Sequence, residues 1–317
     1  MALLAFDLGG TKLATAVFNE KGDIICREIT PLENRKGKEV AQLITDTFCS
    51  TADQLRLSGD DIHSIGISVP GISRSKSGTV WAPNIPGWDD YPLLQEVKEV
   101  AGNIPVKVDS DRACYILGEV WKGNAKDCRD AIFLAVGTGI GAGILTDGKV
   151  LRGAHDIAGA IGWMALDKPF KEEFISCGCF EHYTSGEGIA KQAQHFLRNE
   201  KNYPGELKNK PIEEIDSRDV FSAYKNQDEI AVRVIQNCIE FWGMATANLV
   251  SLFNPEKIIF GGGIFGPAIS FIPQIKTEAT KWAQPISIQQ VSFEKAGTGT
   301  DAGVYGAGYL ALNQLQS

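Results

Sequence analysis

Three glycine-rich turns in the sequence each follow a short apolar run, an arrangement that could bind phosphate. The first is Asp7-Leu8-Gly9-Gly10-Thr11-Lys12, the second is Gly137-Thr138-Gly139-Ile140-Gly141, and the third is Gly261-Gly262-Gly263. Because glycine has no Cβ, the backbone N–H groups of such a turn can approach an anion closely. Any one of them could be no more than a tight turn. Three turns at strand ends, two of them in a repeated unit, favour phosphate binding.

Two side chains of the first turn could add to such a site. The Asp7 carboxylate could position Mg²⁺ directly or through water, or it could simply stabilise its own turn. Lys12 could contact phosphate, although a lysine at the edge of a strand is more often only solvated. With three phosphate turns in the chain, the magnesium role fits Asp7 better.

The glycine spacing also permits a rival interpretation, a dinucleotide-binding fold. Residues 137–142 fit the relaxed GxGxxA pattern and residues 261–266 fit GxGxxG. That pattern should open a helix inside a βαβ unit. The first match instead opens a second strand followed by an Asp147-Gly148 hairpin signal, and the second lacks an acidic residue at the offset of ~20 residues. The P-loop pattern GxxxxGK[ST] is absent from the sequence. The dinucleotide interpretation is therefore disfavoured.

One carboxylate, Asp111, stands where a catalytic base would be useful. It lies between a predicted strand at 106–109 and a predicted helix at 113–121. When a hydroxyl attacks a phosphorus atom it loses its proton, and a nearby carboxylate can accept that proton. Aspartate is also a common N-cap, because its side chain accepts hydrogen bonds from free N–H groups at a helix start. From the residues alone, the N-cap is the favoured interpretation.

The turns belong to a repeated pattern of strand, glycine turn and returning strand. The pattern covers residues 3–18 and recurs at 131–145, about 130 residues later, which predicts two related α/β domains. Further strands are predicted at 23–27, 62–69, 106–109, 257–260 and 286–293, and helices at 40–55, 91–100, 113–121, 184–199, 228–252, 268–282 and 301–312. The stretch 201–218, which contains two prolines, is the predicted surface excursion.

Length and composition narrow the class of protein. A chain of 317 residues favours two domains. The net charge is −8 and no basic stripe stands out, which argues against nucleic acid as the main partner. The seven cysteines, an odd number, fit a reducing compartment better than a disulfide framework. The N-terminus does not resemble a signal peptide, and no apolar run approaches the ~20 residues of a membrane span. We therefore predict a cytoplasmic protein without a nucleic-acid or membrane partner.

Together these segments resemble the ROK family (repressor, open reading frame, kinase). The first two turns resemble the family's phosphate motifs, and the third resembles its nucleotide turn near the adenosine. Three other segments also match, Ser68-Val69-Pro70-Gly71, Ala82-Pro83-Asn84 and Asp301-Ala302-Gly303-Val304, so the similarity runs through essentially the whole chain. The ATP contacts that the resemblance implies are Asp7, Gly9, Gly10, Thr11, Lys12, Gly137, Thr138, Gly139, Gly141, Gly261, Gly262 and Gly263.

The resemblance implies a fold as well as a ligand. The expected fold class is α/β, a two-domain actin-like ATPase (ribonuclease H-like) fold that binds ATP, Mg²⁺ and the acceptor in the cleft between its domains. We expect an N-terminal domain at 1–118, a C-terminal domain at 119–300, and a last helix at about 301–317 that packs back on the first domain. The sequence does not decide whether the protein forms a homodimer.

The resemblance also assigns an acceptor site. The family's Asn-Asp-Ala segment carries the base, and this chain reads Ser110-Asp111-Arg112-Ala113 in its place. With the resemblance, Asp111 as the base becomes the favoured interpretation. The sugar contacts implied are Gly71, Asn84, Ser110, Asp111, Trp163 and Glu181.

Two family motifs are altered here. The Glu-x-Gly-His segment, whose Glu and His hold sugar hydroxyls, reads Ala160-Ile161-Gly162-Trp163. The motif that supplies three thiolates to zinc and a Glu to the sugar is shortened to Cys177-Gly178-Cys179-Phe180-Glu181. Zinc normally takes four ligands and the family's histidine ligand is replaced by tryptophan, so we expect no structural zinc. A site completed by His155 and His182 is the alternative. Trp163 could stack on a sugar face or fill the volume that the lost groups leave.

The sequence therefore predicts an ATP-dependent carbohydrate kinase with an altered acceptor pocket and a small-molecule sugar as its partner. The alternative is a sugar- or nucleotide-binding regulatory protein with little catalysis. Repressors of the family carry a DNA-binding domain before the first phosphate motif. That motif begins at Asp7 here, so we expect no such domain.

Overall fold

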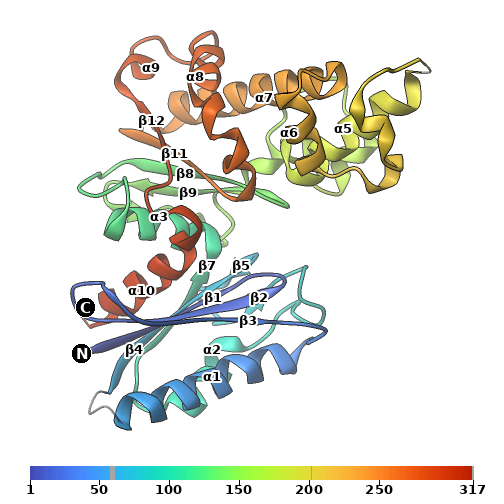
Figure 1. Ribbon diagram of the computed structural model, residues 1–317. Coiled ribbons are helices and arrows are strands. Elements are labelled where there is room, and N and C mark those ends of the chain that lie inside the picture. The colour runs from blue at the N-terminus through green and yellow to red at the C-terminus, as the bar shows by residue number, and fades with distance from the viewer. Residues whose placement is uncertain (58–60, 201, 316–317) are drawn as a thin grey trace.

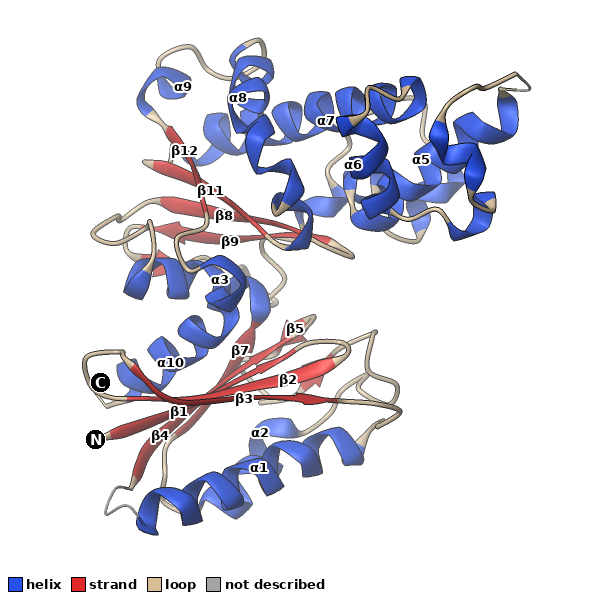
Figure 2. Cartoon of the chain, viewed as in Figure 1, coloured by secondary structure: helices blue, strands red, loops and turns tan. Residues whose placement is uncertain are grey.

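The computed structural model describes residues 1–57, 61–200 and 202–315 of the chain. Figure 1 shows two halves, one built from the N-terminal third of the chain and the other from most of the remainder. Each half contains a five-stranded sheet, and two helices lie between the two sheets (Figure 2).

The N-terminal sheet has the strand order β3-β2-β1-β4-β7. Its strands are β1 (Ala2–Leu8), β2 (Lys12–Phe18), β3 (Ile24–Pro31), β4 (Ile62–Val69) and β7 (Val106–Ser110), and a small hairpin is formed by β5 (Ile72–Ser73) and β6 (Val80–Trp81). The first three strands are antiparallel, whereas β4 and β7 run parallel to β1. Residues Leu3 to Phe6 are fully buried, as in a strand that is covered on both faces.

Helices cover both faces of this sheet. On one face, α1 (Lys38–Leu57) and α2 (Leu93–Ala101) contribute Val40, Ile44 and Val97 to the same core as Phe6. On the other face, α10 (Ala302–Gln314) packs on β1, β2 and β4.

The C-terminal sheet repeats this topology with the order β10-β9-β8-β11-β12. Its strands are β8 (Ala131–Val136), β9 (Ile140–Thr146), β10 (Lys149–Val150), β11 (Lys257–Gly261) and β12 (Ser292–Lys295). The β8–β9 hairpin is antiparallel, and β11 and β12 are parallel to β8 and to each other. The two sheets therefore share the hairpin repeat that the sequence predicts.

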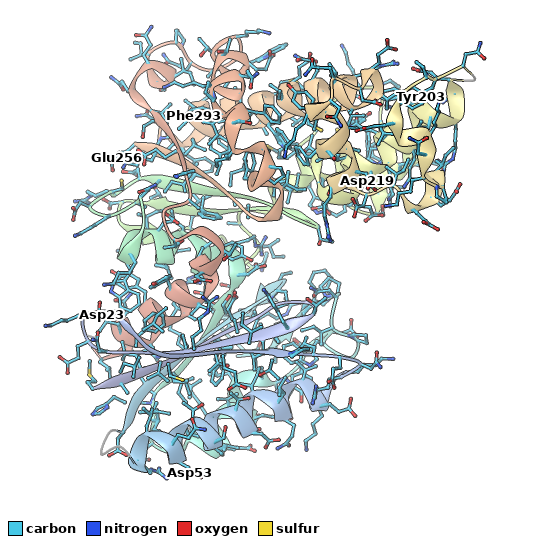
Figure 3. All side chains as sticks on the ribbon, viewed as in Figure 1. Asp23, Asp53, Tyr203, Asp219, Glu256 and Phe293 are labelled. Atoms are coloured by element: carbon cyan, nitrogen blue, oxygen red, sulfur yellow. The ribbon has the colours of Figure 1, made fainter. Side chains whose placement is uncertain are left out.

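Helices account for most of the rest of this half. They are α4 (Cys179–Thr184), α5 (Gly186–Asn199), α6 (Ser217–Lys225), α7 (Glu229–Phe253), α8 (Ile272–Thr280) and α9 (Ser287–Gln290). Their buried side chains form one core with the sheet, in which the Phe260 ring of β11 packs against Phe265 and against Phe293 of β12, which is labelled in Figure 3.

The two halves meet at α10 and α3 (Asp111–Lys122), which cross in close contact. A Cβ added at Gly306 would overlap the carbonyl oxygen of Cys114, so the crossing depends on glycine at that position. The other side of α3 contacts β8 and β9 of the C-terminal sheet. The predicted domain boundary between residues 118 and 119 falls inside α3, and the division into domains stays a prediction.

Two predicted strands differ from the structure. The prediction of a strand over 286–293 is wrong for its first half, where α9 forms a helical turn, because the Gln284 Oε1 accepts hydrogen bonds from the backbone N–H groups of Ile286 and Ser287. The glycine turn predicted over 137–143, with its returning strand at 144–145, is too long: β9 already begins at Ile140, since its glycines let it lie close against α3. Within the described ranges, no helix is both long and apolar enough to cross a bilayer.

Candidate active site

The second and third glycine turns lie next to each other, at the carboxyl ends of two neighbouring strands inside the C-terminal sheet. They follow β8 and β11, which are parallel neighbours that pair Ala135 with Gly261, so both turns emerge at the carboxyl ends of the strands. Gly262 has φ +86°, and a Cβ there would overlap the carbonyl oxygen of Val136. Only glycine allows the third turn to approach the second this closely.

A cavity of about 710 Å³ opens beside these turns and is large enough for a nucleotide. Its wall includes Gly137 and Thr138 of the second turn and Gly263 of the third. The rest of the wall comes from Gly186, Glu187, Ala190 and Gln194 of α5, residues 215–218 and Phe221 at the start of α6, and Ile264 and Pro267.

The sequence interpretation missed the helical wall of this cavity. Helix α5 begins beside the second turn, where the Gly186 N–H donates to the Gly137 carbonyl oxygen at 2.8 Å. Its N-terminal end favours an anion there. Part of the predicted surface excursion, residues 215–218, also lines the cavity. The available signal was the Asp216 capping box of α6, which marks a helix start but not its position in space.

Asp7 of the first turn sits at the junction of three elements. The Ser68 hydroxyl on the neighbouring strand β4 donates to its Oδ1 at 2.7 Å. A Cβ added at Gly303 would overlap the Asp7 carboxylate, which places that carboxylate against the first turn of α10. Burial raises the pKa of Asp7, whereas the Ser68 hydrogen bond and the Lys12 charge lower it. A carboxylate held in this way is a donor of the kind that Mg²⁺ prefers.

Asp111 is the first residue of α3, and the cap belongs to its neighbour. The Ser110 Oγ accepts from the Ala113 N–H at 3.3 Å, which corrects the interpretation of Asp111 as the N-cap. The Asp111 Oδ1 accepts from the Arg112 N–H at 2.7 Å. Burial raises the pKa of Asp111 to about 6, the Arg112 charge and hydrogen bond oppose the rise, and the Asp7 charge adds to it. Such a carboxylate can accept a proton near neutral pH.

Two predicted sugar contacts lie against the glycine turns. Exposed Asn84 borders the first turn, where a Cβ at Gly10 would lie 2.8 Å from its Nδ2. The Glu181 Oε2 accepts from the Ile140 N–H at 2.6 Å, so this carboxylate borders the second turn. Burial raises the pKa of Glu181.

Gly71 and Ser110 are placed differently. The Gly71 carbonyl oxygen accepts from the Arg112 Nη2 at 3.1 Å, and the Arg112 side chain in turn lies against Gly141. The Ser110 hydroxyl is buried and accepts the capping hydrogen bond, which leaves its proton as the group it could offer a substrate.

The sequence model that describes the ROK family matches residues 3–314 of this chain. The chain belongs to the ROK family. It is similar to a glucokinase of Halalkalibacterium halodurans, with 33% identity over 322 residues that cover 98% of this chain and 95% of the relative.

Two further ROK relatives extend the comparison. The chain is 30% identical over 317 residues to a β-glucoside kinase of Listeria monocytogenes, covering 99% of this chain and 98% of the relative. It also resembles the crystal structure of a ROK family glucokinase from Streptomyces griseus in complex with glucose and AMPPNP, with a TM-score of 0.77, 26% identity, and coverage of 99% and 100%. The predicted α/β class and two-domain actin-like ATPase fold are confirmed.

The resemblance assigns Trp163 to the acceptor side, which stays a prediction. Trp163 is 59% exposed, so its ring does not fill a buried volume. Residues 160–163 form a turn against the Cys177–Cys179 segment, where a Cβ at Gly178 would lie 2.6 Å from the Trp163 Cα. Glu181 lies against the neighbouring Gly162, where a Cβ would be 2.9 Å from its Oε2.

The residues of the altered zinc motif do not fit a zinc ion. In the part of the chain that the structure describes, no three His, Cys, Asp or Glu side chains are grouped so as to hold a metal. His155 is exposed, and the His182 ring lies between Phe174 and Tyr183, with centroids 5.3 and 5.0 Å away. The absence of structural zinc stays a prediction.

Proposed function

We propose that this protein transfers the γ-phosphoryl group of ATP to a hydroxyl of a sugar or sugar derivative. The observation that carries the proposal is Asp111, a base candidate with a pKa of about 6. It does not cap α3, and it lies close enough to Asp7 for that charge to raise its pKa. The names of the ROK relatives, glucokinase and β-glucoside kinase, support the same reaction class.

In the proposed reaction the chain positions its reactants and moves one proton. The second and third turns and the start of α5 hold the nucleotide in the cavity, and the first turn holds its terminal phosphates. Asp7 would hold Mg²⁺, which neutralises phosphate charge when bound. Asp111 orients the attacking hydroxyl and accepts its proton as the new O–P bond forms.

The acceptor we propose is not free glucose held in the family's usual manner. Ala160 and Trp163 stand where a carboxylate and an imidazole would hold hydroxyls, and each lost hydrogen bond to a substrate costs ~1–3 kcal/mol. The exposed Trp163 ring offers an apolar face instead, which suits a less hydroxylated sugar or one whose hydroxyl carries a substituent. The β-glucoside kinase relative acts on a sugar of the second kind by name.

An acceptor panel tests this proposal. ADP release is measured with glucose, mannose, fructose, N-acetylhexosamines and aryl or glycosyl β-glucosides, and kcat/KM is compared. We expect weak turnover of glucose and better turnover of a substituted or less hydroxylated sugar. A kcat/KM for glucose of ~10⁴ M⁻¹s⁻¹ or more would contradict the pocket argument. ATP binding without turnover of any sugar would instead favour the regulatory protein.

A further inference from the structure

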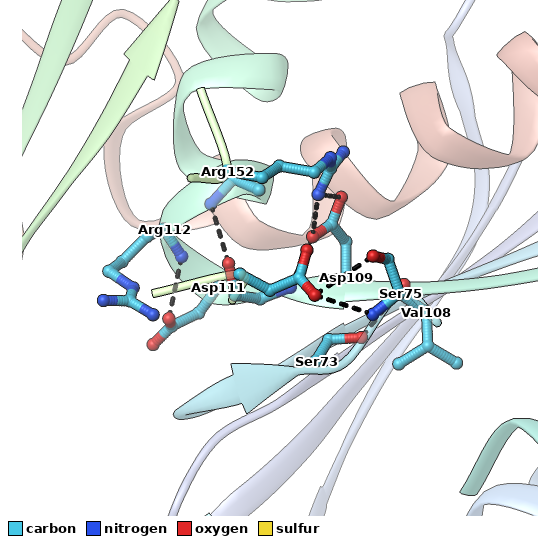
Figure 4. A network of polar contacts seen from close by, with 10 residues as sticks. Ser73, Ser75, Val108, Asp109, Asp111, Arg112 and Arg152 are labelled. Atoms are coloured by element: carbon cyan, nitrogen blue, oxygen red, sulfur yellow. Dashed lines mark hydrogen bonds and ion pairs between the residues drawn. The ribbon is translucent and has the colours of Figure 1, made fainter. Parts of the chain in front are cut away.

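An ion pair between a buried carboxylate and a partly exposed arginine joins the two halves of the molecule a few residues from the proposed base. Asp109, on β7, has a side chain only 4% exposed, and the Arg152 Nη1 lies 2.5 Å from each of its carboxylate oxygens. Figure 4 shows this pair beside Asp111 and Arg112. Arg152 comes from the other half of the molecule, two residues after β10.

The pair connects two segments that the proposed reaction must align. Asp109 is two residues before Asp111, and its Oδ1 also accepts from the Ser110 N–H at 2.8 Å. This carboxylate therefore fixes the corner between β7 and α3. Arg152 lies near the start of the segment 151–160, which leads directly to Ala160 and Trp163 on the acceptor side.

A second contact attaches the same segment to the N-terminal half. The Asp156 Oδ2 accepts from both the backbone N–H and the hydroxyl of Ser75, at 3.0 Å each. Ser75 follows β5, and Figure 4 shows it beside Asp109. Between them, Arg152 and Asp156 hold the segment 151–160 at two points.

The burial of Asp109 makes the pair sensitive to the loss of Arg152. A carboxylate with so little exposure needs a compensating charge, and removing Arg152 would leave it unpaired. The corner could then relieve the unpaired charge by turning toward water, which would displace Asp111. Misplacing a reacting group by about 1 Å can cost about 10²-fold in rate.

We propose that Arg152 is a positioning residue for phosphoryl transfer. Through Asp109 it holds the corner that carries Asp111 in register with the acceptor segment 151–160. The inference rests on the proposed function, because it takes Asp111 as the base. Arg152 itself touches neither the nucleotide nor the acceptor in this role.

The test compares Arg152→Met with wild type on the acceptor preferred in the panel. We expect kcat to fall by about 10²-fold, with the KM for ATP changed less than threefold, because the nucleotide cavity is elsewhere. Arg152→Lys, which keeps the charge, should recover part of the lost rate. Arg152→Ala should recover rate when millimolar guanidinium is added, because the ion can occupy the space beside Asp109. In an Asp109→Asn background, Arg152→Met should cause little further loss.

The matched control is Arg129→Met, which removes an arginine from the exposed Arg129–Asp147 pair in the same half. Its kcat should equal that of wild type. If Arg152→Met lowers the melting temperature but leaves kcat unchanged, or if neither lysine nor guanidinium restores rate, the pair is only structural and the proposal is wrong.

Wild type that turns over no sugar would overturn the proposed function rather than the pair. In that case, the effect of the pair on the corner is tested by amide hydrogen exchange at residues 110–113 with a non-hydrolysable ATP analogue bound. Faster exchange there in Arg152→Met than in Arg129→Met supports the fixed corner, and equal exchange refutes it.

Discussion

At the scale of single residues, the position of Asp111 depends on the serine before it. Ser110 and Asp111 are both residue types that cap helices, so the sequence could not decide which one does so. In the structure the Ser110 hydroxyl satisfies the Ala113 N–H, and Asp111 becomes the first helical residue. A shift of one position along the chain therefore separates a structural aspartate from a candidate base.

Replacing Asp111 by asparagine separates these two roles. As the base, Asp111→Asn should lose transfer by about 10²–10⁴-fold while ATP binding, measured by calorimetry, stays nearly intact. Its melting temperature at pH 8 should not fall, because the variant removes a charge that burial disfavours and leaves the Ser110 cap in place. Near-normal turnover together with a lower melting temperature would show that Asp111 caps the helix and is not the base.

The raised pKa of Asp111 also fixes the sign of the pH dependence. Proton acceptance needs the ionised carboxylate, so kcat/KM should rise with pH and level off above about pH 6 to 7. The folded pKa lies above the ordinary aspartate value of 3.8, so stability contributed by this group is complete below pH 3.8 and is lost as pH rises through about 6. Activity and this part of the stability should therefore change in opposite directions. An apparent pKa below 4.5 for the acidic limb of the rate profile would contradict the assignment.

At the scale of elements, local patterns predicted the strands and helices better than they predicted the site. The two hairpins and the helix at 302–314 follow from periodicity and glycine punctuation. The helical wall of the cavity did not, because residues 215–221 reach Gly137 only through packing between elements distant in sequence. The turn at 287–290 was missed for a similar reason, since it depends on a side-chain cap from Gln284.

The segment 164–184, which carries Glu181, is held together by side-chain contacts. The Lys171 Nζ donates to Asp167 at 3.1 Å and to the Tyr183 hydroxyl at 2.5 Å, and that hydroxyl donates to Asp167 at 2.6 Å. The Tyr183 ring stacks on Phe241 of α7 with centroids 4.4 Å apart. These contacts can order the segment without a metal.

Metal analysis and one lysine variant test this arrangement. Purified protein should carry no stoichiometric zinc, and a chelator should leave its melting temperature unchanged. Lys171→Met should lower the stability by about 1 kcal/mol, because it removes hydrogen bonds to Asp167 and Tyr183 from a partly exposed cluster. The matched control, Lys191→Met, breaks an exposed pair with Glu187 and should cost less than half as much. One zinc per chain by elemental analysis would show that the thiols and a histidine are metal ligands after all.

At the scale of the whole molecule, one carboxylate holds both chain segments that cross between the halves. Glu119 of α3 is fully buried. It accepts from the Asn124 N–H at 2.7 Å in the first crossing, and from the Gly297 N–H at 3.0 Å and the Thr298 N–H at 2.9 Å in the second. The Thr298 hydroxyl donates to it as well. Domain closure would have to bend the chain at these two crossings. Glu119 therefore connects the two crossing segments at the place about which the halves could move.

Glu119→Gln tests how much this junction contributes. The amide keeps the shape of the side chain but removes the charge and turns one acceptor into a donor that faces N–H groups. Unsatisfied buried donors and the loss of charge-assisted hydrogen bonds should together lower the free energy of unfolding by about 2–4 kcal/mol. The matched control is Glu256→Gln, at the exposed end of the C-terminal sheet (labelled in Figure 3), whose Oε1 accepts from the Arg129 and Asp130 N–H groups at 2.8 and 3.1 Å. Solvent can replace those bonds, so the control should lose less than about 1 kcal/mol. Denaturant unfolding at pH 7 measures both values, and equal losses in the two variants would show that burial at the crossings adds nothing to the carboxylate's contribution.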